Sequence, residues 1–141
     1  ARLSRADLSG ANLSNADLSL ADLTGARLSR ADLSKAVLRE TGLSKADLSG
    51  ATLSNADLSG AILREARLSK TDLREVNLFY ADLVGADLVG ADLTSADLNG
   101  ADFRYANLRK TIGLTQDQLD HVFIDISTKL PRNLKRPKGS Q

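Results

Sequence analysis

Cysteine, methionine and tryptophan are absent from this sequence of 141 residues, and proline occurs only twice. Without cysteine the chain can form no disulfide framework and has no thiol chemistry, which permits any compartment. No apolar run reaches the 18 residues that a transmembrane helix requires. Because the chain has no Met and starts at Ala1 in the middle of a pattern, we expect it to be a processed or trimmed piece of a longer product.

An excess of charge of one sign is also lacking. Lys and Arg total 19 against 18 Asp and Glu, and the net charge is −1 over residues 1–110 and +2 over residues 111–141. This balance argues against a nucleic-acid partner or a DNA mimic, both of which depend on a strong field. The sequence offers no nucleophile–base pair, metal-ligand spacing or phosphate-binding loop, so we expect no enzyme and no cofactor.

What the sequence contains is a five-residue repeat. From Ala1 to Lys110 it forms 22 consecutive units of the form A-(D/N)-L-S-x, with Leu at every third position except Phe103. On an α-helix each unit would advance by about 140° and scatter the leucines, and in a flat strand they would alternate between faces. A chain that bends by about a quarter-turn per unit keeps Ala and Leu inside. Gly or Asn at many fifth positions suits a type II turn, although charged residues there leave another turn type open.

The tandem A(D/N)LXX units resemble the pentapeptide-repeat family. The resemblance covers residues 1–110 and implies an all-β solenoid, a right-handed quadrilateral β-helix with four units per coil and about five and a half coils. Some relatives mimic DNA and protect gyrase from quinolones, but they have a strongly acidic face and dimerise through the C-terminal end, and this chain differs in both respects. Relatives occur in bacteria, cyanobacteria and plastids, so the cytoplasm, periplasm and thylakoid lumen all stay open for a protein we expect to be soluble.

Large apolar side chains replace polar ones at five outward positions: Ile62, Phe79, Tyr80, Val84 and Tyr105. Residues 20 apart stack in columns on such a solenoid, which places this group near the corner between the fourth and first faces. Tyr80 should stack between Gly60 and Gly100, and Tyr105 over Gly85. An exposed apolar cluster is typical of a site for a protein partner. The alternative is that these side chains only cover gaps beside glycines.

Two polar features favour an ordinary solvated surface. Stacked carboxylates, Asp82 with Asp102 and Asp72 with Asp92, could form a weak cation site or an acid–base pair, but no pocket is expected around them. A row of hydroxyls lies on the second face: Ser9, Ser29, Ser49 and Ser69. Such a row could match an ordered surface such as ice, but the cationic side chains of Arg30 and Lys70 stand beside it.

After Lys110 the repeat stops, and residues 111–130 are predicted to form a helical cap. Thr115 and Gln118 have the spacing of a capping box. Four apolar residues follow at i, i+3, i+4 and i+7, which indicates one helical stripe: Leu119, Val122, Phe123 and Ile126. His121 is expected to be a polar residue on the exposed side of this helix. Residues 131–141 are predicted to be a basic, flexible tail.

No cap precedes Ala1, so the first coil is expected to be open. Either an upstream segment is missing or two chains form a homodimer there. The function predicted first is a non-enzymatic scaffold that presents a surface to a protein partner. A structural spacer within a longer chain is the alternative alongside the gyrase-binding class.

Overall fold

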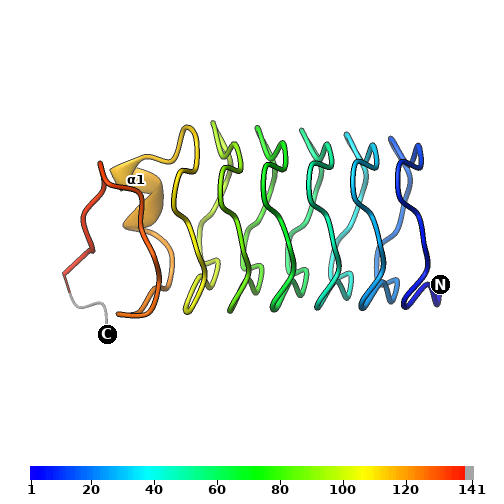
Figure 1. The fold of residues 1–141 in the computed structure, drawn as a ribbon, viewed down its shortest axis with the longest axis horizontal. Helices are drawn as coiled ribbons and strands as arrows, with labels where there is room; N and C mark the ends of the chain where they lie inside the picture. The colour runs from blue at the N-terminus through cyan, green and yellow to red at the C-terminus, as the bar shows by residue number, and fades with distance from the viewer. Residues whose placement is uncertain (139–141) are drawn as a thin grey trace.

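The computed structural model describes residues 1–138 as a β-solenoid. The second residue of each unit pairs in a parallel bridge with the residue 20 positions later, from Arg2–Asp22 to Asp92–Ile112. Four units therefore make one coil with four faces, which we number one to four from the unit 1–5. The coils stack along the long axis, with the N-terminus at one end and α1 at the other (Figure 1). The bridges are single residues, and the one helix within residues 1–138 is α1, Gln116–Leu119.

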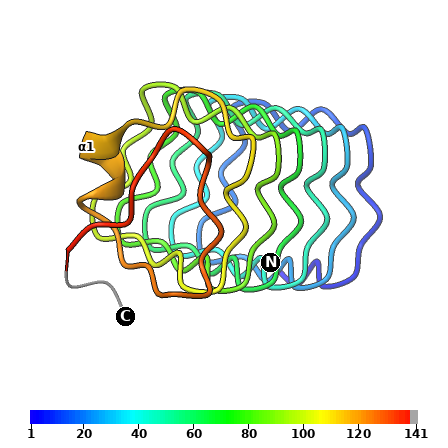
Figure 2. The same ribbon diagram turned by 60° about the vertical axis from the view of Figure 1, so that its left-hand side comes forward.

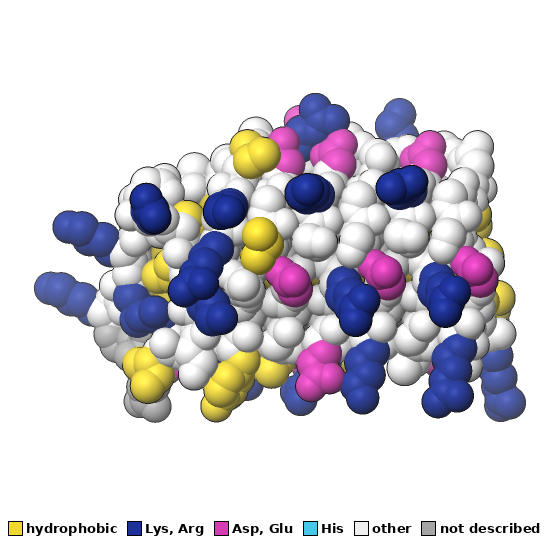
Figure 3. Space-filling model, viewed as in Figure 1, with side chains coloured by type: hydrophobic (Ala, Val, Ile, Leu, Met, Phe, Trp, Pro, Cys, Tyr) yellow, Lys and Arg dark blue, Asp and Glu magenta, His cyan; other side chains and the backbone are white. Residues whose placement is uncertain are grey.

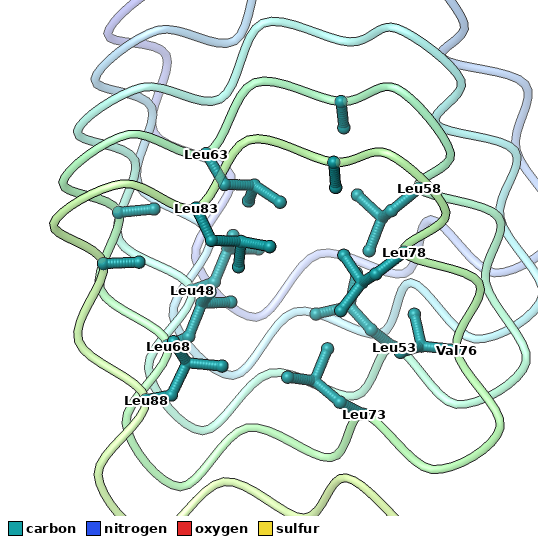
Figure 4. Close-up of a cluster of buried hydrophobic side chains, with 14 of the residues drawn as sticks. Leu48, Leu53, Leu58, Leu63, Leu68, Leu73, Val76, Leu78, Leu83 and Leu88 are labelled. Carbon is teal, nitrogen blue, oxygen red and sulfur yellow. The ribbon is translucent and has the colours of Figure 1, made fainter. Parts of the chain in front are cut away.

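The core is built from the first and third positions of the units. From Ala21 to Leu108 these side chains are all buried, and they include Phe103 at 1% exposure. Leucines of successive coils stack in inward-facing columns, as Leu48, Leu68 and Leu88 show (Figure 4). A buried Leu contributes about 2 kcal/mol, whereas ordering the backbone costs 1–2 kcal/mol per residue, roughly. One coil cannot offset that cost alone, so stability depends on stacking.

Backbone hydrogen bonds join each coil to both neighbours. The amide of Leu28 donates to the carbonyl of Asp47 (2.7 Å), and the amide of Asp47 donates to the carbonyl of Ala26 (2.9 Å). The same two bonds recur from unit to unit along the solenoid. In the first coil the leucines are only partly buried, because no earlier coil of residues 1–138 covers them: Leu3, Leu8, Leu13 and Leu18.

Every unit turns in the same way, whatever residue holds its fifth position. All 22 fifth positions have positive φ, from 53° at Glu40 to 74° at Gly90 and Gly100. The amide after each turn donates back to the Leu or Phe carbonyl, as Ala6 does to Leu3 (3.0 Å). This is the geometry of a type II turn, so charged residues do not introduce another turn type. Fifteen of these residues are not glycine, and they adopt a backbone that Gly or Asn favours.

The helical cap predicted over residues 111–130 is helical only at α1, so the predicted stripe from Leu119 to Ile126 does not lie on one helix. The capping box of Thr115 and Gln118 is present, but α1 ends at Leu119. Phe123 then pairs with Asp102, and Lys129 pairs with Asn107, so the chain rejoins the ladder of faces one and two. Of the four stripe residues, Leu119 is buried, Val122 is partly buried, and Phe123 and Ile126 are 59% and 79% exposed.

The segment 122–132 instead contains two degenerate units. Ile124 follows the bridge residue Phe123 as Leu does in a regular unit, and it is buried. Thr128 precedes the bridge residue Lys129, and its buried hydroxyl donates to the carbonyl of Phe103 (2.9 Å). Thr41 and Thr71 make the equivalent bond to the preceding coil. The four residues with helical spacing thus lie in different structures: Leu119 ends α1, Phe123 is a ladder residue, and Ile126 lies in a turn.

Helix α1 takes the place that a face-four unit would occupy. The side-chain amide of Gln118 donates to the carbonyl of Ala96 (2.9 Å), which a further unit would otherwise cover. It also donates to the carbonyl of Leu93 (3.3 Å), which accepts the turn bond from the Ala96 amide as well. In the second view the helix lies at the end of the stack, beside the last regular coil (Figure 2).

The predicted tail packs against this end as far as the structure describes it. Gln116 and Lys135 exchange two hydrogen bonds, 2.8 and 3.0 Å long. Arg136 donates to the carbonyls of Asp125 and Thr128. Basic side chains and backbone here satisfy polar groups that the ended ladder leaves open, which a free tail would not do. Residues 139–141 of the predicted tail lie outside the described residues.

Candidate functional site

A groove runs across the corner between faces four and one. It is formed by fourth and fifth positions of face four in four successive coils and has a volume of about 540 Å³. We call it the corner groove, and its lining residues are Ser19, Leu20, Arg39, Glu40, Ser59, Gly60, Phe79 and Tyr80. Large apolar side chains stand at both ends, and between them the Glu40 side chain lies against Gly60.

Phe79 and Tyr80 form the C-terminal end of the corner groove. Their rings meet edge to face, with centroids 4.4 Å apart and planes at 88°. Tyr80 has a φ of 54°, and its ring lies against Gly100 in the next coil. The ring therefore does cover a glycine, as the alternative interpretation required. Even so, Tyr80 is 63% exposed and Phe79 is 44% exposed.

The other three residues of the predicted cluster do not all join this pair. Ile62 lies in the middle of face one, 45% exposed, in a column with Gly42 and Asp82. Val84 and Tyr105 belong to fourth and fifth positions of face one, so they lie at its far corner with face two. The five residues thus divide between two corners and the face that joins them.

Tyr105 is not found over Gly85. The atom nearest to a Cβ added at Gly85 is Cγ of Glu65, from the preceding coil. Fifth-position side chains lean toward the C-terminal end, as Tyr80 does toward Gly100 and Glu40 toward Gly60.

Sequence reasoning missed Leu20 at the opposite end of the groove. Its side chain is 72% exposed and its φ is 62°, an unfavourable conformation for a large apolar residue. A usable signal was present, because Leu20 and Tyr80 are 60 residues apart and therefore share a column. An apolar residue at the fifth position of a unit in that column would have identified the other end of the corner groove.

Two charged residues line the corner groove: Arg39 is paired, whereas Glu40 forms no ion pair with another described residue. Arg39 Nε lies 2.5 Å from Asp57 Oδ2 at the edge of the groove. Partial burial acts to raise the pKa of Asp57, but hydrogen bonds from Arg39 and Ser59 outweigh it and hold the pKa below its ordinary value. An exposed pair of this kind contributes about 0–1 kcal/mol to stability. The groove therefore offers apolar contact at its two ends and the Glu40 carboxylate between them.

The stacked carboxylates are engaged within the solenoid. Asp72 binds Arg74 and Asp102 binds Arg104, each at 2.7 Å, and Asp82 binds Arg64 at 2.6 Å. The hydrogen bond from the Arg74 side chain, more than any other influence, holds the pKa of Asp72 below its ordinary value. Within residues 1–138 no group of three or more His, Cys, Asp or Glu side chains could hold a metal ion.

Second-position Asp and Asn have a structural role in the turn. Asp7 Oδ1 accepts from the amide and hydroxyl of Ser9, at 3.1 and 2.7 Å. Asn12 accepts the same two bonds from Ser14 at the same distances. The second position of a unit thus needs a side-chain oxygen that accepts these bonds, and the amide of Asn provides it as well as the carboxylate of Asp.

The serines of the hydroxyl row bond to one another. Ser29 donates to Ser9 (3.5 Å), and Ser69 donates to Ser49 (3.4 Å). Arg30 lines a shallow hollow together with Ser9, Ser29 and Ser49. His121 lies beyond the end of α1, exposed, with Nδ1 2.7 Å from the carbonyl of Asp117. Over the described part of the chain, no helix has the length and hydropathy to cross a membrane.

Comparison with known proteins agrees with this architecture. Pentapeptide repeats match in eight copies, over residues 1–39, 43–78 and 77–112. No curated protein matches the sequence. A pentapeptide repeat protein from the Arabidopsis thaliana thylakoid lumen is 34% identical over 72% of this chain and 70% of that chain, with a TM-score of 0.59.

Two further solved structures are similar. HetL, a pentapeptide repeat protein involved in heterocyst differentiation regulation from the cyanobacterium Nostoc sp. strain PCC 7120, is 32% identical over 99% of this chain and 76% of that chain, with a TM-score of 0.45. QnrB1, a plasmid-mediated fluoroquinolone resistance protein, is 23% identical over 89% of this chain and 78% of that chain, with a TM-score of 0.48.

Proposed function

The chain belongs to the pentapeptide-repeat family, and from this premise we propose that it is a non-enzymatic scaffold that binds a protein partner at the corner groove. Family membership also supports a right-handed quadrilateral form with about five and a half coils over residues 1–110, closed by residues 111–130. The observation that carries the proposal is that the exposed Phe79–Tyr80 pair and the exposed Leu20 stand at the two ends of one groove.

The physical reason is the cost of exposing these side chains. Leu20, Phe79 and Tyr80 keep large apolar surface in water although each lies at a turn where a polar residue or glycine would fit. Aromatic side chains at the edge of a groove are typical anchors of protein interfaces, because they bury much area with little loss of rotamer freedom. A rigid solenoid holds both ends of the groove at a fixed separation.

The charge pattern counts against the DNA-mimicking, gyrase-binding alternative. In the column of second positions on face two, Arg27 and Arg67 alternate with Asp7, Asp47 and Asp87. The face seen in Figure 3 likewise shows Lys and Arg side chains between acidic ones along the long axis. A mimic of duplex DNA needs an acidic surface that these cations interrupt.

The test is affinity capture from a lysate of the organism that makes the protein. The unmodified chain is compared with the double variant Phe79→Ser, Tyr80→Ser and with a control, Phe123→Ser, Ile126→Ser, which removes equally exposed apolar groups at the C-terminal end. We expect the groove variant alone to lose a specific partner while retaining its thermal stability. Identical captured proteins for all three chains would refute the site and favour the spacer.

A homodimer through the first coil is a separate proposal. Its support is that the four leucines of residues 1–20 are only partly buried. Sedimentation equilibrium decides the point: a concentration-dependent rise in mass that Leu8→Asp abolishes supports the dimer, and a monomer at all concentrations rejects it.

A further inference from the structure

A second groove, unrelated to the apolar corner, opens at the C-terminal end of the solenoid. It lies between the turn of the unit 106–110 and the segment 130–133, and its volume is about 850 Å³. We call it the basic groove, because three of its lining residues are cations: Arg109, Lys110 and Arg132. Leu130 and Pro131 supply an apolar wall, and Asn133 a polar rim.

The groove exists because the chain leaves the solenoid path at Pro131. In regular coils the amide of the fifth residue donates to the fourth residue of the next coil, as Gly50 does to Ser69 (3.0 Å) and Gly90 to Arg109 (3.2 Å). The last ladder pair is Asn107 with Lys129. Beyond it, within residues 1–138, no backbone carbonyl accepts from the amide of Lys110. The chain turns one residue later than in a regular unit, where the amide of Leu134 donates to the carbonyl of Pro131 (3.3 Å). The regular place of this turn, above the Lys110 amide, is therefore left open.

The three cations of the basic groove are not neutralised. Only four Lys or Arg side chains within residues 1–138 pair with carboxylates, namely Arg39, Arg64, Arg74 and Arg104, so the basic groove differs from the rest of the surface in that three unpaired cations line one groove. Among the described residues, no carboxylate forms an ion pair with Arg109, Lys110 or Arg132. Three cations held close together without counter-charges favour an anionic ligand.

Positive charge is also concentrated at the C-terminal end of the chain as a whole. Residues 104–138 carry eight Lys and Arg against three Asp, a net charge of +5, whereas residues 1–103 carry eleven against fifteen Asp and Glu, a net charge of −4. The C-terminal end of an almost neutral protein is therefore strongly basic. This polarity steers an anionic partner toward the end that contains the groove.

We propose that the basic groove binds an extended acidic peptide segment of a protein partner. The segment occupies the regular place of the turn, its backbone accepts from the Lys110 amide, and its Asp or Glu carboxylates contact Arg109, Lys110 and Arg132. Addition of an extended chain to an open ladder is a recurrent way to bind peptides. A groove of about 850 Å³ has room for several residues of an extended chain, and it contains no aromatic side chain on which nucleic-acid bases could stack.

The test is fluorescence anisotropy with a fluorescein-labelled peptide of about eight alternating Asp and Glu residues, a length that suits an extended ligand. The full chain is compared with the triple variant Arg109→Gln, Lys110→Gln, Arg132→Gln. The matched control Arg5→Gln, Lys35→Gln, Lys70→Gln removes the same charge from cations in earlier coils. Thermal melting verifies that both variants stay folded.

We expect the groove variant to weaken peptide binding at least about tenfold and the control less than about threefold, because local contacts and not net charge hold the peptide. Phe79→Ser, Tyr80→Ser should leave this binding unchanged, so the result is independent of the proposed function. Equal losses in both triple variants, or no binding by the unmodified chain, would overturn the proposal. Displacement of the peptide by oligothymidylate at lower concentration than by unlabelled peptide would overturn the choice of a peptide ligand.

Discussion

The ring of Tyr80 lies so close to Gly100 that a Cβ atom added at Gly100 would come within 2.7 Å of Tyr80 Cε1. Gly100 also has a φ of 74°, where a side chain is strained by about 1–2 kcal/mol. The glycine therefore serves two purposes, since it forms the turn and makes room for the ring that ends the corner groove.

We predict that Gly100→Ala lowers the free energy of unfolding by more than Gly50→Ala does. Gly50 has a φ of 67°, and an added Cβ would meet only an ordinary contact with Arg30 at 3.7 Å. The difference should be about 0.5–1.5 kcal/mol, the cost of forcing the Tyr80 ring away from its rotamer. Urea denaturation measures it. In the background of Tyr80→Ser the difference should vanish, and its persistence would show that the ring is not responsible.

Two substitutions at the C-terminal end distinguish the short helix α1 from the longer helix that the apolar stripe predicts. A stripe treats Leu119 and Ile126 alike, but Leu119 is 1% exposed and Ile126 is 79% exposed. We predict that Leu119→Ala lowers the unfolding free energy by about 2–4 kcal/mol and that Ile126→Ala changes it by less than about 0.5 kcal/mol. Chemical denaturation distinguishes them, and equal losses would restore the longer helix.

These residues show where prediction from sequence succeeds and where it stops. The solenoid is predictable, because an unbroken period of five with Leu at the third position allows one continuous core only when the chain turns at every unit. The column of Tyr80 and Gly100 follows from the same arithmetic. The segment 119–126 is different, because its apolar residues Leu119, Val122, Phe123 and Ile126 fit helical spacing. In the structure, Val122 and Ile124 instead flank the bridge residue Phe123. Only the pairing of Phe123 with Asp102 decides between them.

The site was less predictable than the fold for a related reason. Columns fix which residues stack, but they do not show the direction in which a side chain leans along the axis. All six covered fifth-position glycines, from Gly25 to Gly100, receive the side chain of the preceding coil. Tyr105 is therefore not over Gly85. Nor does a column show the departure of the chain at Pro131 that opens the basic groove.

Acid should weaken the solenoid through its turn carboxylates. The hydroxyl and amide of Ser34 donate to Asp32, and they hold the pKa of Asp32 below its ordinary value of 3.8. Because the folded pKa is depressed, this contribution to stability is full above the ordinary value and is lost as the pH falls through the folded pKa. We predict that Asp32→Asn lowers the unfolding free energy only slightly at neutral pH, since Asn12 makes the same two bonds but an amide lacks the charge of the carboxylate.

The measurement is urea denaturation at a series of pH values from neutral to below the ordinary pKa of Asp. The loss of stability in acid should be smaller for Asp32→Asn than for the unmodified chain. Ser34→Ala, which removes the hydroxyl donor, should raise the pKa of Asp32 in an NMR titration. An unchanged titration would show that the Ser34 hydroxyl does not stabilise the carboxylate.

Gly113 is where the chain leaves the regular ladder for α1, and we predict that Gly113→Ala is the most damaging glycine substitution. Its φ is 76°, and an added Cβ would lie 2.1 Å from Thr94 Oγ1 and 2.8 Å from Thr94 Cα. Thr94 Cα is backbone and cannot turn aside, so α1 must move from the carbonyls that Gln118 covers. We expect Gly113→Ala to lower the free energy of unfolding by about 3 kcal/mol or more.

Gly85→Ala is the control. Its φ is 72°, and the nearest atom to an added Cβ belongs to the flexible Glu65 side chain, 3.4 Å away, so this substitution should cost about 1–2 kcal/mol. Hydrogen exchange should also quicken at residues 96–100 in Gly113→Ala alone, because the end of face four loses its cover. Equal losses and unchanged exchange would mean that α1 is not held in place through Gly113.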